Sequence, residues 1–279
     1  MFDKKMIHST AVIHPKAQLD PSVEVGPYAV IDAHVSLGAG CRVGPHVYLT
    51  GHTRIGANNR FYAGCVVGEA PQDVKYNNEP TELRMGDNNL VREGATIHRS
   101  AKIGEATVIG SNNSLMVNSH VAHNAILGNH IILANGALLA GHVEVGDRVF
   151  ISGNCLVHQF VRIGTLALMQ GGAAISRDLP PYTVARWGNG ICGLNTIGLR
   201  RAGLSPRERL ELKELYHKLF RSGKNMTTAV AKARAEYSSG PAKVLLDFVA
   251  SAKRGVCRDV SVMARGGKKV SDTDEENID

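Results

Sequence analysis

Four histidines lie close together in the middle of this sequence: His120, His123, His142 and His158. An imidazole side chain can bind a metal ion, accept a proton as a general base near neutral pH, or decorate a surface. These three roles predict different proteins. The spacing of the histidines, and the elements that carry them, must therefore decide among the roles.

A six-residue repeat sets the spacing of these side chains. Every sixth residue is apolar from Ile7 to Val67, and again from Met85 through Ile103 to Ile175, which gives 27 hexads; the pattern lapses only at Asp73 and Glu79. This period is typical of a parallel β-helix, in which three hexads form one coil. We predict a mainly β fold of about nine coils, with the first and fifth residues of each hexad pointing inward.

The cysteines and glycines fit the same repeat. Cys41, Cys65 and Cys155 take the fifth, inward position, which predicts small core residues. The five cysteines are an odd number without a C-x-x-C pair, so we expect neither a disulfide framework nor a thiolate zinc site. Glycine often follows the first residue of a hexad, where we expect it to serve corners with positive φ.

The repeat is interrupted once and then ends. Residues 69–84 are polar, contain proline and leave the register, which predicts a loop that projects from the β-helix. We assign residues 1–188 to the β-helix, 189–262 to an α-helical C-terminal domain, and 263–279 to a disordered tail.

The C-terminal part shows helical signals. Residues 205–208 read Ser-Pro-Arg-Glu, a capping box with proline at the first helical position. Residues 227–237 and 242–253 predict two further helices, separated by SSGP.

Charge is unevenly distributed along the chain. Residues 1–185 carry no net charge, residues 186–271 carry a net charge of +12, and the last eight residues carry −5. The basic C-terminal region predicts an acidic partner. No stretch approaches the roughly 18 to 20 apolar residues of a membrane span, and no apolar segment follows the N-terminal charges, so we expect a soluble, cytoplasmic protein.

The separations of the histidines discriminate between metal binding and acid–base chemistry. Coils are spaced about 4.8 Å apart, so ligands stacked in one column would recur every 18 residues. The separation is 19 from His123 to His142, 22 from His120 to His142, and 16 from His142 to His158. The histidines therefore lie on successive coils without sharing a column. A zinc site formed by three histidines across a subunit interface stays geometrically possible.

General-base catalysis suits this arrangement better. A hydroxyl or amine that attacks a thioester needs a general base, and the unperturbed pKa of an imidazole suits proton abstraction near neutral pH. The backbone N–H of Gly141 could stabilise the oxyanion without steric hindrance. In the hexad frame His120 is a sixth residue and His123 a third, so both are free to face outward.

Several phrases resemble those of the acyl-ACP:UDP-N-acetylglucosamine O-acyltransferases that begin lipid A biosynthesis. The phrases are GEAPQDVKY (68–76), TIHR (96–99), NSHVAHNAILGN (118–129), LAGHV (139–143), VHQF (157–160), DLPPY (178–182) and GLNTIGLRRAG (193–203). The resemblance implies a homotrimer of left-handed parallel β-helices with helical C-terminal domains and active sites between subunits. It also implies acyl carrier protein (ACP) and a UDP-amino sugar as partners, with no cofactor, no metal and no nucleic acid.

The resemblance assigns roles to individual residues. His123 would be the general base that takes a proton from the sugar 3-hydroxyl, and Gly141 the oxyanion donor. Substrate contacts would come from the loop, the histidine cluster and the C-terminal domain: Gln72, Asp73, Lys75, His120, His142, His158, Gln159, Asn195 and Arg201. His158 could equally serve packing. Residues around Met169, Gln170 and Gly171 would line the far end of an acyl-chain groove.

The chain departs from the family pattern at three positions. Asn124 follows the implied base where an aspartate is common, and an amide cannot stabilise an imidazolium by charge. Ile197 and Ala202 stand where some members have an acidic residue and a second arginine. Related enzymes with similar departures can prefer a 3-amino sugar and form an amide, so the acceptor atom stays open between oxygen and nitrogen.

Three other functions compete with this assignment. One is a hexapeptide transferase that uses acetyl-CoA, against which the PQDVKY loop and the basic region argue. Another is a metal-dependent hydratase on the same scaffold. The last is a non-catalytic β-helix, for which His123, His142 and Gln159 together are more than the role requires.

Overall fold

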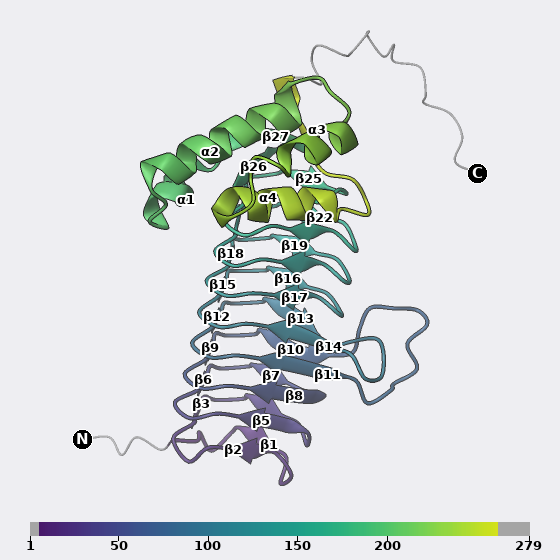
Figure 1. Ribbon diagram of the computed structural model, residues 1–279. Helices are drawn as coiled ribbons and strands as arrows, with labels where there is room; N and C mark the ends of the chain where they lie inside the picture. The colour runs from purple at the N-terminus through teal and green to yellow at the C-terminus, as the bar shows by residue number, and fades with distance from the viewer. Residues whose placement is uncertain (1–5, 262–279) are drawn as a thin grey trace.

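The computed structural model describes residues 6–261, and its strands form a left-handed parallel β-helix with three flat walls (Figure 1). The first wall contains β1 (Val12–Ile13), β4 (Val30–Ile31), β7 (Tyr48–Leu49), β10 (Val66–Glu69), β13 (Thr96–His98), β16 (His120–Val121), β19 (Leu138–Leu139), β22 (Leu156–Val157) and β25 (Ala174–Ile175). The second contains β2 (Gln18–Leu19), β5 (Val35–Leu37), β8 (His52–Ile55), β11 (Glu82–Met85), β14 (Ala106–Ile109), β17 (Ile126–Leu127), β20 (Glu144–Val145) and β23 (Arg162–Ile163).

The third wall continues beyond the hexad repeat. It contains β3 (Glu24–Val25), β6 (Arg42–Val43), β9 (Arg60–Phe61), β12 (Leu90–Val91), β15 (Ser114–Leu115), β18 (Ile132–Leu133), β21 (Phe150–Ile151) and β24 (Leu168–Met169), followed by β26 (Thr183–Arg186), β27 (Gly190–Leu194) and β28 (Arg258–Asp259). The predicted fold class is therefore confirmed.

Regular coils pair at a separation of 18 residues, as in Leu138 with Leu156. The first and fifth residues of the hexads fill the interior; Leu139 and Ala137 are both fully buried. Cys41, Cys65 and Cys155 are also fully buried, which confirms their predicted place in the core. Burial raises the pKa of the Cys65 thiol to about 12, so this group stays protonated and inert.

The expectation for the second-position glycines is wrong. Positive φ occurs instead at the fourth position of the hexad, where many coils carry asparagine or histidine. Glycine at the second position serves close approach between coils: a Cβ atom on Gly110 would stand 2.3 Å from the carbonyl oxygen of Gly128. The same backbone-to-backbone contact recurs at Gly38, whose Cβ would stand 2.7 Å from the Gly56 carbonyl carbon.

Two insertions, rather than one, interrupt the coils. The predicted loop 69–84 is shorter, because Glu69 ends β10 and Glu82–Met85 forms β11, with Leu83 fully buried. The hexad prediction at Ile103 is wrong: its side chain is 64% exposed. Glu82 pairs with Ala106 at a separation of 24 residues, so this coil holds six extra residues between β13 and β14.

Helices cross the C-terminal end of the β-helix, opposite the N-terminus (Figure 1). They are α1 (Thr196–Arg201), α2 (Pro206–Tyr216), the π-helix η1 (His217–Arg221), α3 (Met226–Ala233) and α4 (Gly240–Ala250). The capping box at Ser205 is confirmed, since Ser205 and Glu208 bond each other's backbone N–H. The predicted helices 227–237 and 242–253 correspond to α3 and α4. The helix that starts at Ser205 was expected to run through Leu219 and Phe220, and its last turn is the π-helix η1, whereas α1 was not expected.

The division at residue 188 stays a proposal. β27 follows that boundary but hydrogen-bonds to β26, so the sheet crosses it. The tail predicted for residues 263–279 lies outside the described residues. Among residues 6–261, no helix is long and apolar enough to cross a membrane.

Candidate active site

The corner between the first and second walls brings the histidines together. His123, Gly141 and Gln159 occupy the third hexad position in successive coils, 18 residues apart. The fourth position forms a neighbouring column of Asn124, His142 and Phe160, each with φ between 54° and 64°. The predicted arrangement is thus confirmed: the histidines lie on successive coils in adjacent columns.

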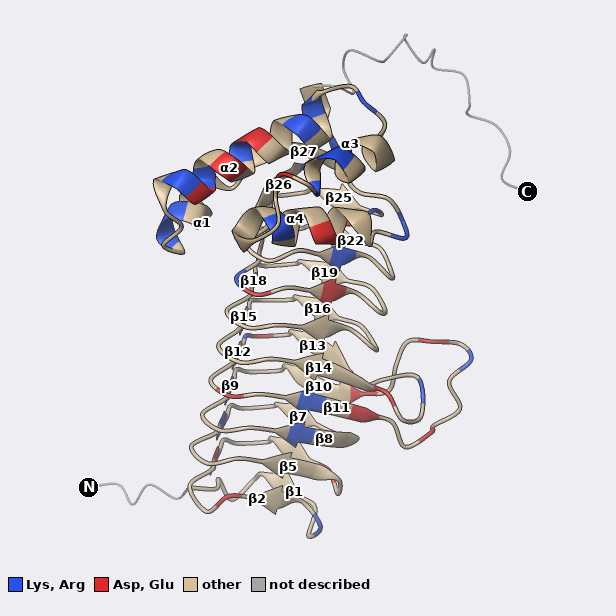
Figure 2. Ribbon diagram, viewed as in Figure 1, with Lys and Arg blue, Asp and Glu red and all other residues tan. Residues whose placement is uncertain are grey.

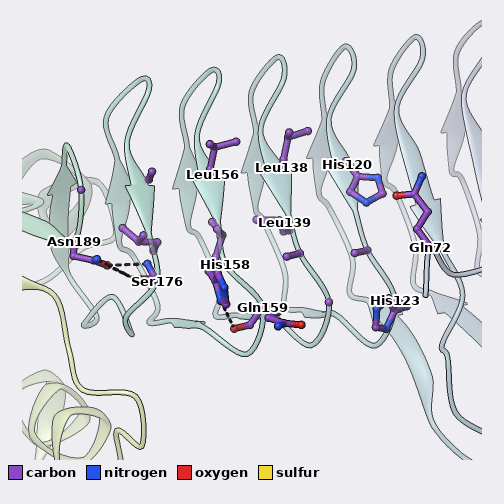
Figure 3. A pocket seen from close by; sticks show the side chains of 17 residues that line it. Gln72, His120, His123, Leu138, Leu139, Leu156, His158, Gln159, Ser176 and Asn189 are labelled. Atoms are coloured by element: carbon purple, nitrogen blue, oxygen red, sulfur yellow. Dashed lines mark hydrogen bonds between the residues drawn. The ribbon is translucent and has the colours of Figure 1, made fainter. Parts of the chain in front are cut away.

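An open cavity of about 760 Å³ lies along the first wall and this corner. It is lined by Gln72, His120, Ala122, His123, Leu138, Leu139, Ala140, Gly141, Leu156, Val157, His158, Gln159, Ala174, Ile175, Ser176, Gly188 and Asn189. Figure 3 shows Leu138 and Leu156 beside each other on the outer face of the wall, with Gln72 and His120 at one end and Asn189 at the other. The exposed fractions of Leu138 and Leu156 are 40% and 49%, so an apolar strip faces the cavity.

Gly141 leaves room for the His123 ring. A Cβ atom built on Gly141 would stand 2.7 Å from both Cε1 and Nε2 of His123, closer than real atoms approach. Any larger residue would displace the ring. The absence of a side chain at position 141 is therefore what allows the Nε2 edge of His123 to lie beside the backbone of the next coil.

The other ring nitrogen of His123 is held by Asn124. His123 Nδ1 lies 2.9 Å from Asn124 Oδ1. The backbone N–H of Ala101 also donates to this Oδ1, at 2.9 Å, and Asn124 Nδ2 donates to Glu105 Oε2 and Ser100 Oγ, each at 2.8 Å. A backbone N–H can only donate and a carboxylate can only accept, so these partners fix which end of the amide is oxygen.

This orientation also fixes the tautomer of His123. Because Asn124 Oδ1 accepts, His123 Nδ1 must carry the proton and donate it. Nε2 then holds the free lone pair. A neutral histidine arranged in this way can take a proton from a group in the cavity.

A buried histidine, His98, and a half-buried one, His120, lie near this base. The His98 ring meets the His120 ring edge-on with centroids 5.1 Å apart, and His120 Nδ1 lies 2.7 Å from Thr96 Oγ1. Burial, with the neighbouring His120, lowers the pKa of His98 to about 4. Burial also lowers the pKa of His120, with His123 as the next cause. Both rings therefore stay neutral at neutral pH; His120 hydrogen-bonds to Thr96, whereas the buried Nδ1 of His98 has no hydrogen-bond partner among the described residues.

His142 stands on the other side of the corner. Its ring stacks on Phe160 with centroids 4.5 Å apart and meets the His123 ring edge-on at 5.3 Å. Burial, followed by His123, lowers the pKa of His142. His142 lines a second cavity of about 700 Å³, together with Glu105 and Asn124, rather than the cavity of His123.

The excursion loop reaches the cavity through Gln72. Arg99 holds the loop, because its guanidinium donates to Tyr76 Oη at 3.1 Å and to the Gly68 carbonyl oxygen at 2.9 Å. Asp73 and Lys75 do not line the cavity of the single chain, and Asp73 Oδ1 accepts from the Lys75 backbone N–H.

The remaining predicted site residues lie elsewhere in the single chain. Asn195 caps α1, accepting from the Gly198 N–H and donating to the Leu166 carbonyl oxygen, and Arg201 ends that helix. Gln170 and Gly171 are exposed at another corner. The groove prediction for Met169 is wrong, because this first-position side chain is fully buried inside the β-helix.

Other residues of the cavity escaped the sequence. Ser176 and Asn189 come from different elements and are joined by a 2.7 Å bond from the Ser176 N–H to Asn189 Oδ1. Leu138 and Leu156 share the sixth hexad position with His120, a signal that could have identified them as outward-facing. Partners of Asn124 lie in the second insertion. This insertion could not be recognised from the sequence, because the apolar Ile103 fits the hexad period.

The described residues offer no metal site. Among residues 6–261, no group of three histidine, cysteine, aspartate or glutamate side chains is arranged to hold a metal ion.

Comparison with known proteins gives consistent matches. Residues 178–257 match the family model described as Udp N-acetylglucosamine O-acyltransferase, domain 2. The acyl-[acyl-carrier-protein]–UDP-N-acetylglucosamine O-acyltransferase of Janthinobacterium sp. (strain Marseille) is 44% identical over 261 residues, covering 91% of this chain and 99% of the relative. The enzyme of the same name from Myxococcus xanthus (strain DK1622) is 45% identical over 256 residues, covering 90% and 99%.

Solved structures agree with these matches. The UDP-N-acetylglucosamine acyltransferase of Francisella novicida superposes with a TM-score of 0.87 at 36% identity, covering 93% of this chain and 96% of that protein. The similarity extends over both the β-helix and the C-terminal helices.

Proposed function

Because the chain belongs to the acyl-[acyl-carrier-protein]–UDP-N-acetylglucosamine O-acyltransferase family, and is thus an acyltransferase, we propose that it acylates a UDP-N-acetylglucosamine-type sugar nucleotide. The donor is a 3-hydroxyacyl chain carried by ACP, the acceptor is the 3-position of the sugar, and the reaction is the first step of lipid A biosynthesis. The observation that carries this proposal is the free Nε2 of His123, held at the mouth of a cavity with an apolar strip.

The chemistry follows from the tautomer of His123. Nε2 takes the proton of the sugar 3-hydroxyl as its oxygen attacks the thioester carbonyl carbon. A carbon–oxygen bond forms, the carbonyl oxygen becomes an oxyanion, and the carbon–sulfur bond then breaks. The His123 imidazolium returns its proton to the departing thiolate of the carrier. No cofactor takes part.

Gly141 is the proposed oxyanion donor. Within residues 6–261, its N–H has no recorded acceptor, whereas the adjacent N–H groups of Ala140 and His142 bond to Val157 and His123. Other turn residues at the third hexad position share this free N–H. What distinguishes Gly141 is that its Cα, which carries no side chain, stands beside the Nε2 edge of a histidine ring.

The cavity lining suits both substrates. Gln72 and His120 supply polar groups at the His123 end of the cavity, and Gln159 adds one two coils away, which favours a sugar with several hydroxyls near His123. The exposed Leu138 and Leu156 favour an alkyl chain along the wall, since burying apolar surface contributes about 25 cal/mol per Å².

A homotrimer would complete this site. The cavity is open, and a single chain keeps Asn195, Arg201, Gln170 and Gly171 away from His123. We propose that these residues reach the substrates of a neighbouring subunit's His123. Asp73, Lys75, His142 and His158 would contact substrate from the same corner.

The basic C-terminal region is the proposed docking surface for ACP. Lysines and arginines gather on the helices (Figure 2), and Arg177, Arg234 and Arg258 line a cavity of about 660 Å³ between α3, α4 and the end of the β-helix. An acidic carrier would be steered to such a surface.

The 3-amino sugar is the alternative acceptor, favoured by the departures at Asn124, Ile197 and Ala202. An amine is a better nucleophile than a hydroxyl and needs less help from a base. Acetyl-CoA-dependent transfer is a further alternative that the same experiment can address. Metal-dependent hydration is another, which stoichiometric zinc in the purified protein would support.

The test is a mass-spectrometric assay of a ladder of acyl-ACPs against UDP-N-acetylglucosamine and its 3-amino analogue. We expect acyl transfer from one range of 3-hydroxyacyl chains, with an ester or an amide identifying the acceptor. Acetyl-CoA serves as the competing donor. Transfer from acetyl-CoA but from no acyl-ACP would contradict the proposal.

A further inference from the structure

Glu105 approaches the proposed base through Asn124. Asn124 Oδ1 lies 2.9 Å from His123 Nδ1, and Asn124 Nδ2 donates to Glu105 Oε2 at 2.8 Å. Asn124 is buried, with 6% of its surface exposed, whereas the Glu105 side chain is 41% exposed, so these bonds are partly shielded from water. A continuous chain of hydrogen bonds therefore links a carboxylate to the base.

The second insertion, between β13 and β14, supplies the hydrogen-bonding partners of the Asn124 amide. The six extra residues between β13 and β14 bring Ser100, Ala101 and Glu105 around the Asn124 amide. Asn124 also donates its backbone N–H to Thr107 Oγ1 at 2.8 Å. With these partners, all the hydrogen-bonding capacity of the amide is used, and it cannot rotate without leaving buried groups unpaired.

We propose that Glu105 is a positioning residue for His123: through Asn124 it fixes the tautomer of the base and supplies the negative charge that asparagine lacks. The inference deepens the proposed function, on which its kinetic part rests. As His123 becomes an imidazolium, the Asn124 dipole and the Glu105 carboxylate behind it stabilise the positive charge. The carboxylate thus acts one residue further from the ring than an aspartate at position 124 would.

Glu105 stays ionised in this setting. Lys102 Nζ donates to its other oxygen, Oε1, at 2.6 Å, and this bond is the first cause that lowers the pKa of Glu105. The bond from Asn124 also lowers it. Lys102 offsets part of the carboxylate's field, but its side chain is 72% exposed and solvent screens it more than it screens the buried amide.

Other titratable groups face this cluster from neighbouring coils. His98, His120 and His142 each interact electrostatically with His123, and each is held neutral by burial. Asp73, Glu105 and Lys102 act on His142, and Glu69 and Arg99 act on His98. Of the described carboxylates, Glu105 is the one joined to Asn124 by a recorded bond.

The first test replaces Glu105 with glutamine in the full-length protein. Glu105→Gln keeps an acceptor for Asn124 Nδ2 and removes the charge. We expect kcat to fall about tenfold, less than the ~10² or more attributed to a general base itself. Loss of the anion removes its stabilisation of the His123 imidazolium, so the acid limb of the kcat/KM profile should move down by about half a pH unit. A purely structural role would lower activity without moving that limb.

Glu144→Gln is the matched control. Glu144 lines the same second cavity of about 700 Å³ as Glu105. Its side chain is exposed and forms no hydrogen bond to His123 or Asn124. Glu144→Gln should leave the acid limb of the kcat/KM profile within about 0.1 pH unit of the parent's, since solvent screens an exposed charge. An equal shift in both variants would overturn the specific role of Glu105.

The second test moves the charge by one residue. Asn124→Asp alone would set two carboxylates at the 2.8 Å contact, so activity should fall. In the Glu105→Gln background the same change places one carboxylate against His123 and should restore kcat to within about threefold of the parent. Asn124→Asp having the same effect in both backgrounds would overturn the proposal.

The third test does not need acyl transfer. Nitrogen-15-labelled histidine spectra, with His123 assigned from a His123→Gln variant, should show Nδ1 protonated in the neutral ring and a lower pKa for His123 in Glu105→Gln. An unchanged titration overturns the role of Glu105 whether or not the enzyme acylates the proposed acceptor. Absence of acyl transfer by the parent, with the titration shifted, would contradict the proposed function alone.

Discussion

The Nε2 edge of His123 lies 2.7 Å from the point where a Cβ atom would stand on Gly141, one coil away. The two residues are 18 positions apart in the sequence and share one column of the β-helix. The proposed base and the proposed oxyanion donor are thereby placed side by side by the coil repeat itself. This contact makes position 141 sensitive to the smallest substitution.

Gly141→Ala should lower kcat by about 10² or more, because the new methyl group displaces the His123 ring and crowds the oxyanion position. Gly153→Ala is the control: it changes the same hexad position at another corner, where the new Cβ would stand 3.3 Å from the Asn135 carbonyl oxygen. Steady-state kinetics and thermal melting check both. Comparable kcat values for the two variants would contradict this role of Gly141.

His123→Ala should nearly abolish acyl transfer. We expect kcat to fall by a factor of about 10² to 10⁴, which is the contribution of general-base catalysis. The proposed trimer and the melting temperature should be nearly unchanged, because the ring is only half-buried and lies outside the core. Kinetics and light scattering measure the two effects. Activity within tenfold of the parent would remove His123 as the base.

Lys75→Ala should mainly raise KM for the sugar nucleotide, because the loop that carries Lys75 is held against the cavity by Arg99. The expected increase is about tenfold or less, the range of an exposed charged contact. Lys16→Ala, at the exposed N-terminal end of the β-helix, is the control. A KM equal to that of the control would remove Lys75 from the substrate site.

Leu156→Gln should weaken binding of the acyl donor rather than binding of the sugar nucleotide. The side chain is 49% exposed on the wall of the cavity, so a polar group there removes apolar contact without opening the core. KM for acyl-ACP should rise several-fold, and more for longer chains, at about 0.8 kcal/mol per lost methylene contact. An equal effect on all chain lengths would place the acyl chain elsewhere.

Stability should depend on pH through His98. Its pKa, about 4 in the folded protein, lies below the ordinary 6.5, so the unfolded chain binds the extra proton between these values. The free energy of unfolding should therefore fall as pH drops from about 6.5 to 4, by up to about 3 kcal/mol. His98→Phe should flatten this dependence in urea titrations. His130→Phe, at an exposed histidine, should retain the parental slope.

Much of the fold followed from local pattern. In a β-helix the inward and outward directions repeat with the hexad, so the apolar first residues and small fifth residues predicted the core and the outward places of His120 and His123. The capping box at Ser205 was equally readable, because a helix start depends on residues three positions apart.

The tertiary structure decided what depends on contacts between coils. Ile103 fits the apolar period but is exposed, because six extra residues leave the wall there and clamp Asn124. Met169, by contrast, had been expected in a groove although it is a first-position residue of its hexad, and it is fully buried as that position predicts.

The sequence by itself therefore determined the repeat, its core and the column of His123, since these follow from a period of six. Only the tertiary structure decided which groups surround that histidine. Glu105 comes from the coil before Asn124, and the six-residue insertion between β13 and β14 sets where its carboxylate meets the Asn124 amide. Gly141, by contrast, follows from the 18-residue coil repeat. The sequence thus contains Glu105, whose carboxylate carries the charge that Asn124 lacks. That this carboxylate lies behind Asn124, close to His123, could not be predicted from the sequence.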